Sequence, residues 1–427
     1  MELESSSNID NEIIDPEQPK YKSYKYRWIV LILFMFAGAI TQIIWVTYGT
    51  IVDETAGFFS VSEIEILLLA LIFMVVYIPV NFLACWVIDK LGLKWGTGIG
   101  VILTGVFGFL RVFAVIMATP NYPMLLTFQI MTAIGQPFVL NSFTKLAAAW
   151  FPESEKTLAS GLGTMSMLIG VLIAFLLPPM LVTRIGIDLT MSWITWSFGI
   201  AALVCMVLYL IFVRNKPPTP PNAYADETKT LALKGTRSMF KKRDFNLLFV
   251  IFLFGFGSFN AISAVIDVIF DYPIEDPIPG HIGALIIGGG ILGAVVISAL
   301  SDYLRKRKIF IIISMAAGIV LLPIFFFVDV TIVRYIISFF AGFFLISLLP
   351  VGLTYAAEIT HPLPEETSNG LMMWVGQIGG IVLLGCIMLA ESSSYMFINF
   401  IVMIVLFVAS TVLAFLMKDL SAYEVKS

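Results

Sequence analysis

The sequence predicts an all-α integral membrane protein whose twelve transmembrane helices form two six-helix bundles. Of its 427 residues, 59% are hydrophobic and 13% are charged, whereas soluble proteins have about 45–50% and about 25%. The apolar residues also gather into twelve runs, each close to the roughly 20 residues that span a bilayer. These runs begin near Trp28, Ile64, Trp95, Tyr122, Thr157, Thr190, Phe245, Ile282, Ile309, Ile332, Thr367 and Met396.

The positions of lysine and arginine indicate which side of the membrane each connecting segment occupies. If both termini are cytoplasmic, all but three of the 25 basic residues fall in cytoplasmic segments or at inner helix ends, as the positive-inside rule requires. The exceptions are Arg184 and Arg334 in outer loops and Arg111 inside a helix. We therefore expect a multi-pass protein with both termini in the cytoplasm, and we take the plasma membrane as its expected location.

A polar segment divides the chain in the middle. It contains the run Pro-Pro-Thr-Pro-Pro at 217–221, which favours extended backbone, and it continues with polar and basic residues. We expect it to be a cytoplasmic linker between the bundles. The expected segments are an N-terminal tail at 1–27, a first bundle at 28–213, the linker at 214–244, a second bundle at 245–417 and a C-terminal tail at 418–427.

The two halves resemble each other weakly. Asp89-Lys90-Leu91-Gly92 follows the second helix, and Asp302-Tyr303-Leu304-Arg305 follows the eighth. The fifth and eleventh helices both open with Glu-Thr-rich turns and carry a glycine at the same offset, Gly170 and Gly379. Two parallel six-helix halves are typical of major facilitator transporters, so we expect that fold.

The repeated acidic and basic loops suggest an inner gate. We expect Asp89 with Lys94, and Asp302 with Arg305, to form ion pairs that hold the halves together when the outside is open. The alternative is that these loops are only topology signals. Arg111 and Asp267 lie in the outer part of the membrane and are candidates for an outer gate.

One stretch is more specific than the rest. Ala133-Ile134-Gly135-Gln136-Pro137, together with Trp45-Val46-Thr47-Tyr48 and Gln377-Ile378-Gly379-Gly380, resembles the feline leukaemia virus subgroup C receptor-related family of facilitators. Known members of that family carry choline and ethanolamine, have been linked to haem, or move pyridoxine. The resemblance implies a transporter of a small organic solute that works by alternating access.

The resemblance also implies a central binding site. In the choline-carrying members it is built by a tryptophan of the first helix, a glutamine of the fourth, a tyrosine of the seventh and a glutamine of the eleventh. The matching positions here are Trp45, Gln136, Asn260 and Gln377, with Tyr48 as a further candidate. Because Asn260 replaces an aromatic residue, we expect a weaker cage for a quaternary ammonium group and a better fit for a less alkylated amine or a polar ring.

The residues themselves support a central site. At about 1.5 Å per residue, Gln136 lies roughly 21 Å from the outer end of its helix and Gln377 roughly 15 Å from the inner end of its own. Both are near the midplane, where an amide without a partner is costly, and Trp45 offers a ring face to a cation. The alternative is that the amides only bind neighbouring helices and that Trp45 only packs.

Embedded charges are few, which bears on the mechanism. The first, fourth, fifth, eighth and eleventh helices carry no carboxylate at mid-depth, although proton-coupled transporters normally use one. We expect a facilitative carrier of a small amine or cation such as choline or ethanolamine. A proton-coupled carrier of a pyridoxine-like ring, with Asp267 or Glu358 as the proton site, and a haem exporter are the alternatives.

Other classes of protein have little support. Cys85, Cys205 and Cys386 lie in apolar segments, and His281 and His361 have no metal-ligand spacing around them. The sequence has no phosphate-binding glycine loop and no nucleophile elbow. We expect no enzymatic activity, no cofactor, no metal and no nucleic acid, and a monomer whose partners are a small-molecule substrate and the lipid bilayer. A non-transporting membrane receptor or scaffold is the alternative from another class.

Overall fold

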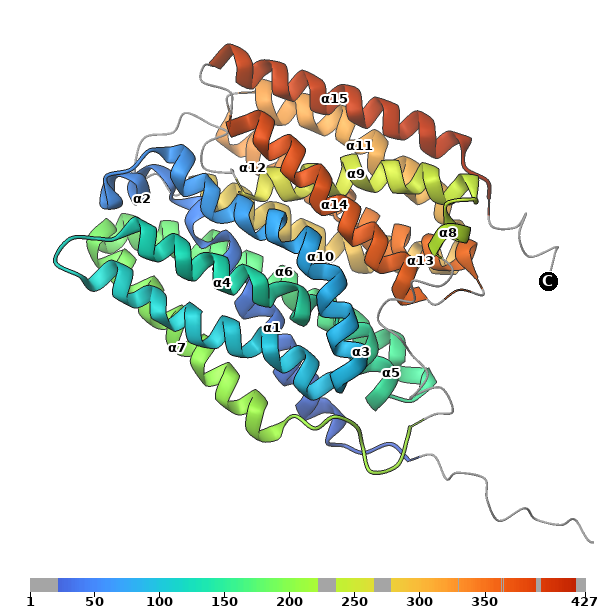
Figure 1. Ribbon diagram of the computed structural model, residues 1–427. Helices are drawn as coiled ribbons and strands as arrows, with labels where there is room; N and C mark the ends of the chain where they lie inside the picture. The colour runs from blue at the N-terminus through green and yellow to red at the C-terminus, as the bar shows by residue number, and fades with distance from the viewer. Residues whose placement is uncertain are drawn as a thin grey trace, which may run out of the picture.

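A computed structural model of the protein describes residues 22–221, 236–264, 278–328, 330–361, 363, 365–388 and 393–419. These residues form long helices that lie side by side, joined by short turns (Figure 1). Asp267, half of the expected outer gate, lies outside the described residues.

The described residues confirm the twelve predicted crossings. Eleven helical segments are long and apolar enough to cross a membrane. The longest, α3 (Glu63–Ile116, 54 residues), holds two crossings, because its backbone leaves the helical conformation at Gly92 (φ 79°, ψ 176°). A Cβ atom is strained at this φ, and one at Gly92 would also lie 2.4 Å from Asn215 Oδ1.

The other elements follow the predicted order, with additional short helices at several ends. Those before residue 221 are α1 (Arg27–Val46), the 3-10 turn η1 (Thr47–Thr50), α2 (Val52–Phe59), α4 (Tyr122–Leu140), α5 (Phe143–Trp150), α6 (Glu153–Ile185) and α7 (Ile187–Phe212). Those after residue 235 are α8 (Thr236–Met239), α9 (Arg243–Ala264), α10 (Ile278–Leu304), α11 (Arg307–Phe327), α12 (Thr331–Leu345), α13 (Leu348–Thr360), α14 (Glu365–Met388) and α15 (Ser393–Leu416).

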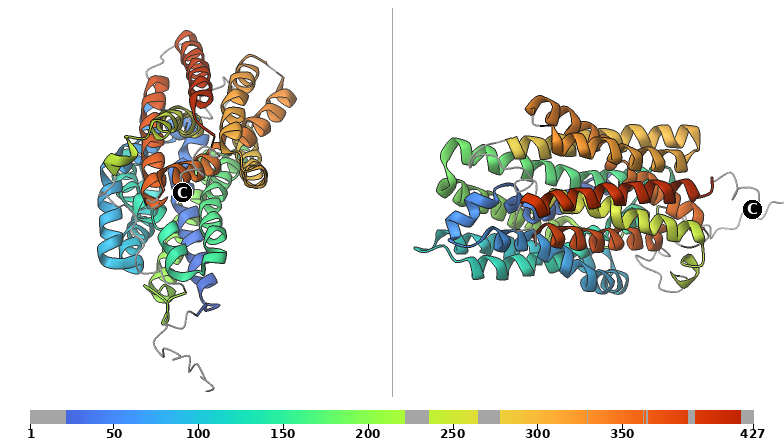
Figure 2. Two further views of the ribbon diagram at one scale, coloured as in Figure 1. Left: turned by 90° about the vertical axis from the view of Figure 1, so that its right-hand side faces the viewer. Right: turned by 90° about the horizontal axis from the view of Figure 1, so that it is seen from above.

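The helices form two bundles. Figure 1 shows α1–α7, the first bundle, on one side of the molecule and α9–α15, the second bundle, on the other. Seen from above in Figure 2, their long axes run in nearly the same direction. The bundles meet chiefly where α6 packs against α10 and where α3 packs against α14.

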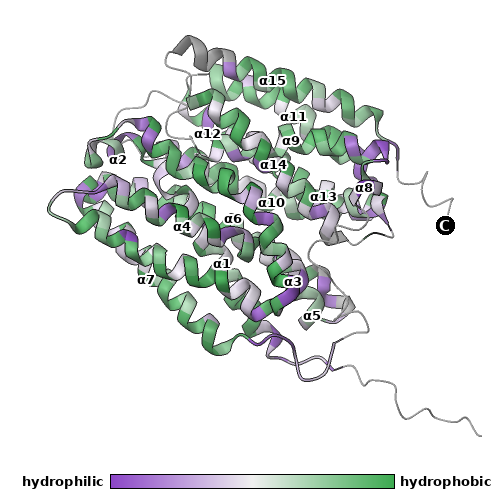
Figure 3. Ribbon diagram, in the orientation of Figure 1, coloured by the Kyte–Doolittle hydropathy of each residue, from purple (hydrophilic) through white to green (hydrophobic). Residues whose placement is uncertain are grey.

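The outer surface of the bundles is apolar. Hydrophobic residues run along the helices, and hydrophilic ones concentrate near their ends (Figure 3). Large side chains stand exposed on this surface, for example Trp193 at 62%, Val320 at 61% and Phe415 at 61%. Apolar surface this extensive marks contact with a membrane rather than with water.

The two ends of the molecule differ in how closely the bundles approach. At the end that carries Lys156 and Glu358, called the basic end below, a vestibule with an empty volume of about 1360 Å³ separates α6 from α13. At the opposite end the bundles touch: a Cβ atom at Gly49 would lie 2.5 Å from the Ala264 carbonyl oxygen. The molecule is therefore open at the basic end and closed at the other.

Candidate binding site

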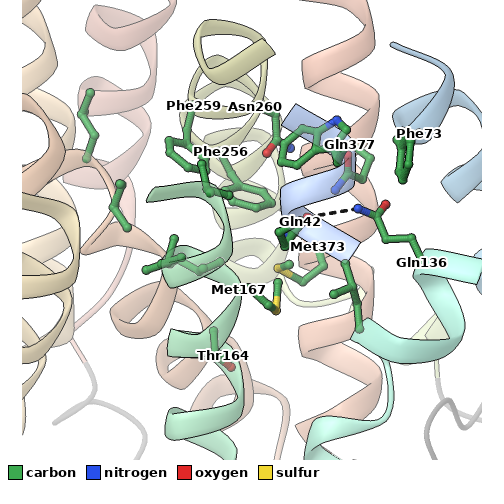
Figure 4. Close-up of a pocket in the computed structure, with 17 residues that line it drawn as sticks. Gln42, Phe73, Gln136, Thr164, Met167, Phe256, Phe259, Asn260, Met373 and Gln377 are labelled. Carbon is green, nitrogen blue, oxygen red and sulfur yellow. Dashed lines mark hydrogen bonds between the residues drawn. The ribbon is translucent and has the colours of Figure 1, made fainter. Parts of the chain in front are cut away.

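A central cavity lies between the two bundles, farther from the basic end than the vestibule. Its empty volume is about 680 Å³. It shares Thr164, Leu168, Ile346 and Leu349 with the vestibule, so the two spaces adjoin. Side chains from α1, α3, α4 and α6 line it on one side, and side chains from α9 and α14 and from the α12–α13 junction line it on the other (Figure 4).

The structure brings four of the predicted binding residues together around this cavity. They are Trp45 on α1, Gln136 on α4, Asn260 on α9 and Gln377 on α14, and all four are buried. Two belong to each bundle, so a ligand that touches all of them would bridge both bundles. That these residues bind substrate stays a prediction.

A pair of glutamines forms the polar wall of the cavity. Gln136 Nε2 donates a hydrogen bond to Gln42 Oε1 across 3.1 Å, as Figure 4 shows. The sequence reasoning missed Gln42. The available signal was its spacing, since Gln42 lies three residues before Trp45 and therefore on the same face of α1. Because Gln42 uses its carbonyl oxygen for Gln136, its amide N–H₂ group remains as a donor.

Trp45 is held in place by the first bundle. Its indole Nε1 donates to the Ala70 carbonyl oxygen of α3 at 3.2 Å, and only 5% of the residue is exposed. With the N–H group occupied, the ring contributes its surface to the cavity. A tryptophan face attracts a cation more strongly than any other side-chain ring.

Asn260 and Gln377 supply amides from the second bundle. Asn260 Nδ2 donates to the Gly376 carbonyl oxygen at 3.4 Å, which fixes the amide and leaves Oδ1 as an acceptor. Gln377 is the next residue on α14 and lines the same cavity. An ammonium or hydroxyl group between these two amides would find acceptors on both.

The central cavity is lined by more aromatic rings than the sequence indicated. Asn260 does replace a ring, but Phe256 and Phe259 of the same helix line the cavity and stack with their centroids 5.9 Å apart and their planes at 19°. Phe73 of α3 adds another ring to the lining. Phe256 and Phe259 of α9 therefore add ring faces that the sequence did not indicate, and the weaker cage expected from Asn260 stays a prediction.

The central cavity has no formal charge. Among its described lining residues there is no aspartate, glutamate, lysine, arginine or histidine. A cation would be held by ring faces and amide oxygens rather than by a counter-ion. A carboxylate or phosphate would meet the negative faces of the rings, so this cavity disfavours an anionic ligand.

Tyr48 and Arg111 lie away from the central cavity. Beyond Trp45 the chain tightens into η1, and this directs the Tyr48 ring toward Arg111, whose guanidinium carbon lies 5.8 Å from the ring centroid. Arg111 is 1% exposed, and its Nη1 donates to Gln129 Oε1 at 3.1 Å. Gln129 in turn donates to the Ile44 carbonyl oxygen. This network lies within the first bundle and links α1, α3 and α4.

The expected ion-pair partner of Asp89 is corrected. Lys145 Nζ lies 2.7 Å from Asp89 Oδ1, while the Lys94 ammonium lies over the Trp95 ring, 5.6 Å from its centroid. The cause is the break between α4 and α5. Asn141 lies in that break, and its Nδ2 donates to Asn81 Oδ1 of α3 at 2.7 Å. This contact brings Lys145, one helical turn later, next to Asp89 of α3.

The partner of Asp302 is also corrected. Arg307, at the start of α11, forms ion pairs with Asp302 and with Glu358 at 3.1 Å. Arg305 sits in the turn between α10 and α11 with a φ of 52° and is exposed. Like the Asp89–Lys145 pair, these contacts join residues of one bundle rather than the two bundles to each other.

We expect Arg307→Gln to lower the transport rate and to leave ligand affinity unchanged, because the residue ties α10, α11 and α13 together at the basic end but does not line the central cavity. The pairs are partly exposed, so the loss in stability should stay within about 1 kcal/mol. Initial uptake rates and ligand-induced thermal shifts would be measured. Arg305→Gln is the matched control. An equal loss of rate in both variants would contradict a specific role for Arg307.

Comparison with known proteins gives the class. The sequence profile of the Major Facilitator Superfamily matches residues 30–384. A crystal structure of a D-xylose–proton symporter shares the fold, with a TM-score of 0.73 at 13% identity, and the match covers 92% of this chain and 99% of that one. The fold and the profile together define a membrane transporter of the major facilitator class.

Two relatives refine the assignment. Solute carrier family 49 member A3 of Xenopus tropicalis is 30% identical over 88% of this chain and 80% of that protein. The choline/ethanolamine transporter FLVCR2 of Homo sapiens is 27% identical over 84% of this chain and 71% of that protein. The chain belongs to the Major Facilitator Superfamily, and within it to the family of solute carrier family 49 member A3. The second relative confirms the resemblance that the motifs indicated.

Proposed function

We propose that the chain is a facilitative carrier of a small amine of the choline and ethanolamine class. The observation that supports this best is the uncharged central cavity, which combines the faces of Trp45, Phe256 and Phe259 with the amides of Gln42, Gln136, Asn260 and Gln377. Ring faces suit an ammonium group, and amide groups suit the neighbouring hydroxyl. The substrate of the relative FLVCR2, as its name states it, has this chemistry.

The proposed mechanism is alternating access. We assign the basic end to the cytoplasm, which makes this conformation inward-open: the vestibule leads to the central cavity, and contacts such as Gly49 against Ala264 close the outside. Because each bundle contributes lining residues, a relative rotation of the bundles would expose the same cavity to the other side. In this proposal the protein acts as a monomer in the plasma membrane.

We propose that transport is passive. A proton-coupled carrier needs a titratable group that the substrate can reach, and the described lining of the central cavity holds none. The alternative proton site, Glu358, lines the vestibule and is bound to Arg307. Transport driven by a pH gradient would favour the alternative reading as a proton-coupled carrier of a pyridoxine-like ring.

A thermal-shift screen of the purified protein tests the substrate class. A ligand that binds only the folded state adds RT ln(1 + [L]/Kd) to the stability, or about 2.7 kcal/mol at a hundred times Kd. We expect choline or ethanolamine to raise the melting temperature, and pyridoxine and haem to leave it unchanged. Stabilisation by pyridoxine or haem alone would contradict the proposal.

We also expect a defined topology. With residues 1–27, 214–244 and 418–427 on the cytoplasmic side, tags placed in each of them should resist protease added to intact cells and should be cut once the cells are permeabilised. A tag inserted after Gly57, on the proposed outer side, is the control and should be cut in intact cells. Cleavage at one terminus but not at the other would contradict the assignment.

A further inference from the structure

A second cavity adjoins the central one on the side of the second bundle. It has an empty volume of about 480 Å³ and shares Phe259, Leu345 and Ile346 with the central cavity. Figure 4 shows Phe259 at the margin of the central cavity, away from Gln136. The two spaces therefore meet along these three side chains. We call the second one the annex.

The annex is apolar, and buried side chains form much of its lining. Its lining includes Phe175 of α6, Leu322 and Phe325 of α11, and Ala341 of α12, all of them no more than 5% exposed. Ser263 supplies the only polar side chain among the described lining residues. An apolar space of this kind offers water few hydrogen-bond partners and favours an apolar occupant.

Three of the four amides lie on the side of the central cavity away from the annex. In Figure 4, Gln42, Gln136 and Gln377 lie on one side of the central cavity, and Phe256 and Phe259 lie on the other. The annex continues from Phe259, away from the glutamines. A bound molecule thus meets amides at one end and an apolar space at the other, an arrangement that neither choline nor ethanolamine would fill.

We propose that the annex is a subsite for an apolar substituent on the amine that the central cavity binds, so that the preferred substrates are amphipathic amines with an alkyl or aryl group. This inference rests on the proposed function, because it takes the ammonium group to lie among the rings and amides of the central cavity. Phe259, Leu345 and Ile346 border both spaces, so a molecule that extends past these side chains would occupy both.

Binding of a homologous series of alkyltrimethylammonium ions, from methyl to octyl, tests the subsite. Each methylene that enters an apolar site should improve affinity about fourfold until the annex is full. The dissociation constants would be measured by isothermal titration calorimetry on the purified full-length protein, with choline as the reference. We expect affinity to rise with chain length and then to level off.

Filling the annex separates specific binding from partition into detergent. Ala341→Leu and Ser263→Leu, two independent variants at residues that line only the annex, should flatten the dependence on chain length and leave choline affinity unchanged. If one variant fails to fold, the other gives the result.

The outcomes of the series are distinct. If affinity depends on chain length equally in the wild type and in a folded variant whose annex is filled, the proposed subsite is wrong. Choline binding with no gain from longer chains would overturn it and leave the proposed function standing. Binding of the longer ions alone, lost in the filled variants, would support the annex and contradict a carrier of small amines. No binding by any member would overturn both.

Discussion

Replacing Trp45 with leucine is expected to weaken binding of choline or ethanolamine by about 2- to 30-fold, which corresponds to a cation–π contribution of roughly 0.5–2 kcal/mol. Leucine keeps apolar bulk in the cavity but removes the ring face, together with the N–H group that donates to the Ala70 carbonyl oxygen. Dissociation constants would be measured by calorimetry on the purified protein, and Trp45→Phe, which retains a smaller ring face, should recover part of the affinity.

The matched control is Trp196→Leu. Trp196 contacts the aromatic ring of Phe109 at a centroid distance of 5.8 Å, but it is 40% exposed on α7 and is not among the residues that line the cavity. We expect its replacement to leave ligand affinity unchanged. If both tryptophan variants bind the amine as tightly as the wild type, Trp45 only packs and the proposed cage is contradicted.

Replacing Gly49 with leucine is expected to reduce transport at least about tenfold. A shift of ~1.4 kcal/mol in the equilibrium between the conformation open at the basic end and the one open at the opposite end changes their ratio by that factor. In the conformation that is open at the basic end, a Cβ atom at this position would lie 2.5 Å from the backbone oxygen of Ala264, and a backbone atom cannot move away as a side chain can. When the bundles separate at this end the conflict disappears, so the variant should populate the outward-open state.

Labelling of a cysteine in the vestibule measures this shift. Thr354 lines the vestibule, and Thr354→Cys in a Cys386→Ala background should react more slowly with a water-soluble maleimide when Gly49→Leu is present. Gly57→Leu is the control, since no atom lies within 4 Å of a Cβ at that position. Wild-type uptake and labelling rates in Gly49→Leu would show that this contact does not close the outer side.

The sequence predicted the fold and much of the cavity for a physical reason. Twelve apolar runs must cross the bilayer as helices, because lipid offers the backbone no hydrogen-bond partners. An amide deep in such a run must find a polar partner, and this singled out Gln136 and Gln377, whereas Asn260 was assigned through the family resemblance. The structure places all three around one space with Trp45.

What the sequence did not predict depends on contacts between distant segments. The rings of Phe256 and Phe259 could be assigned to the cavity only once the rotation of α9 was known, and the hydrogen bond between Gln136 and Gln42 only once the packing of α1 against α4 was known. The break after α4 brings Lys145, rather than Lys94, to Asp89. A single sequence shows which groups a helix carries, whereas their partners follow from how the helices pack.

Uptake of radiolabelled choline and ethanolamine into proteoliposomes tests the central claim most directly. We predict saturable uptake that follows the amine gradient, is indifferent to an imposed pH gradient, and is impaired to a similar degree by Gln42→Leu and Gln136→Leu, because each removes one side of the hydrogen bond between them. Uptake that requires the pH gradient, or wild-type rates in both glutamine variants, would contradict a passive amine carrier built around this cavity.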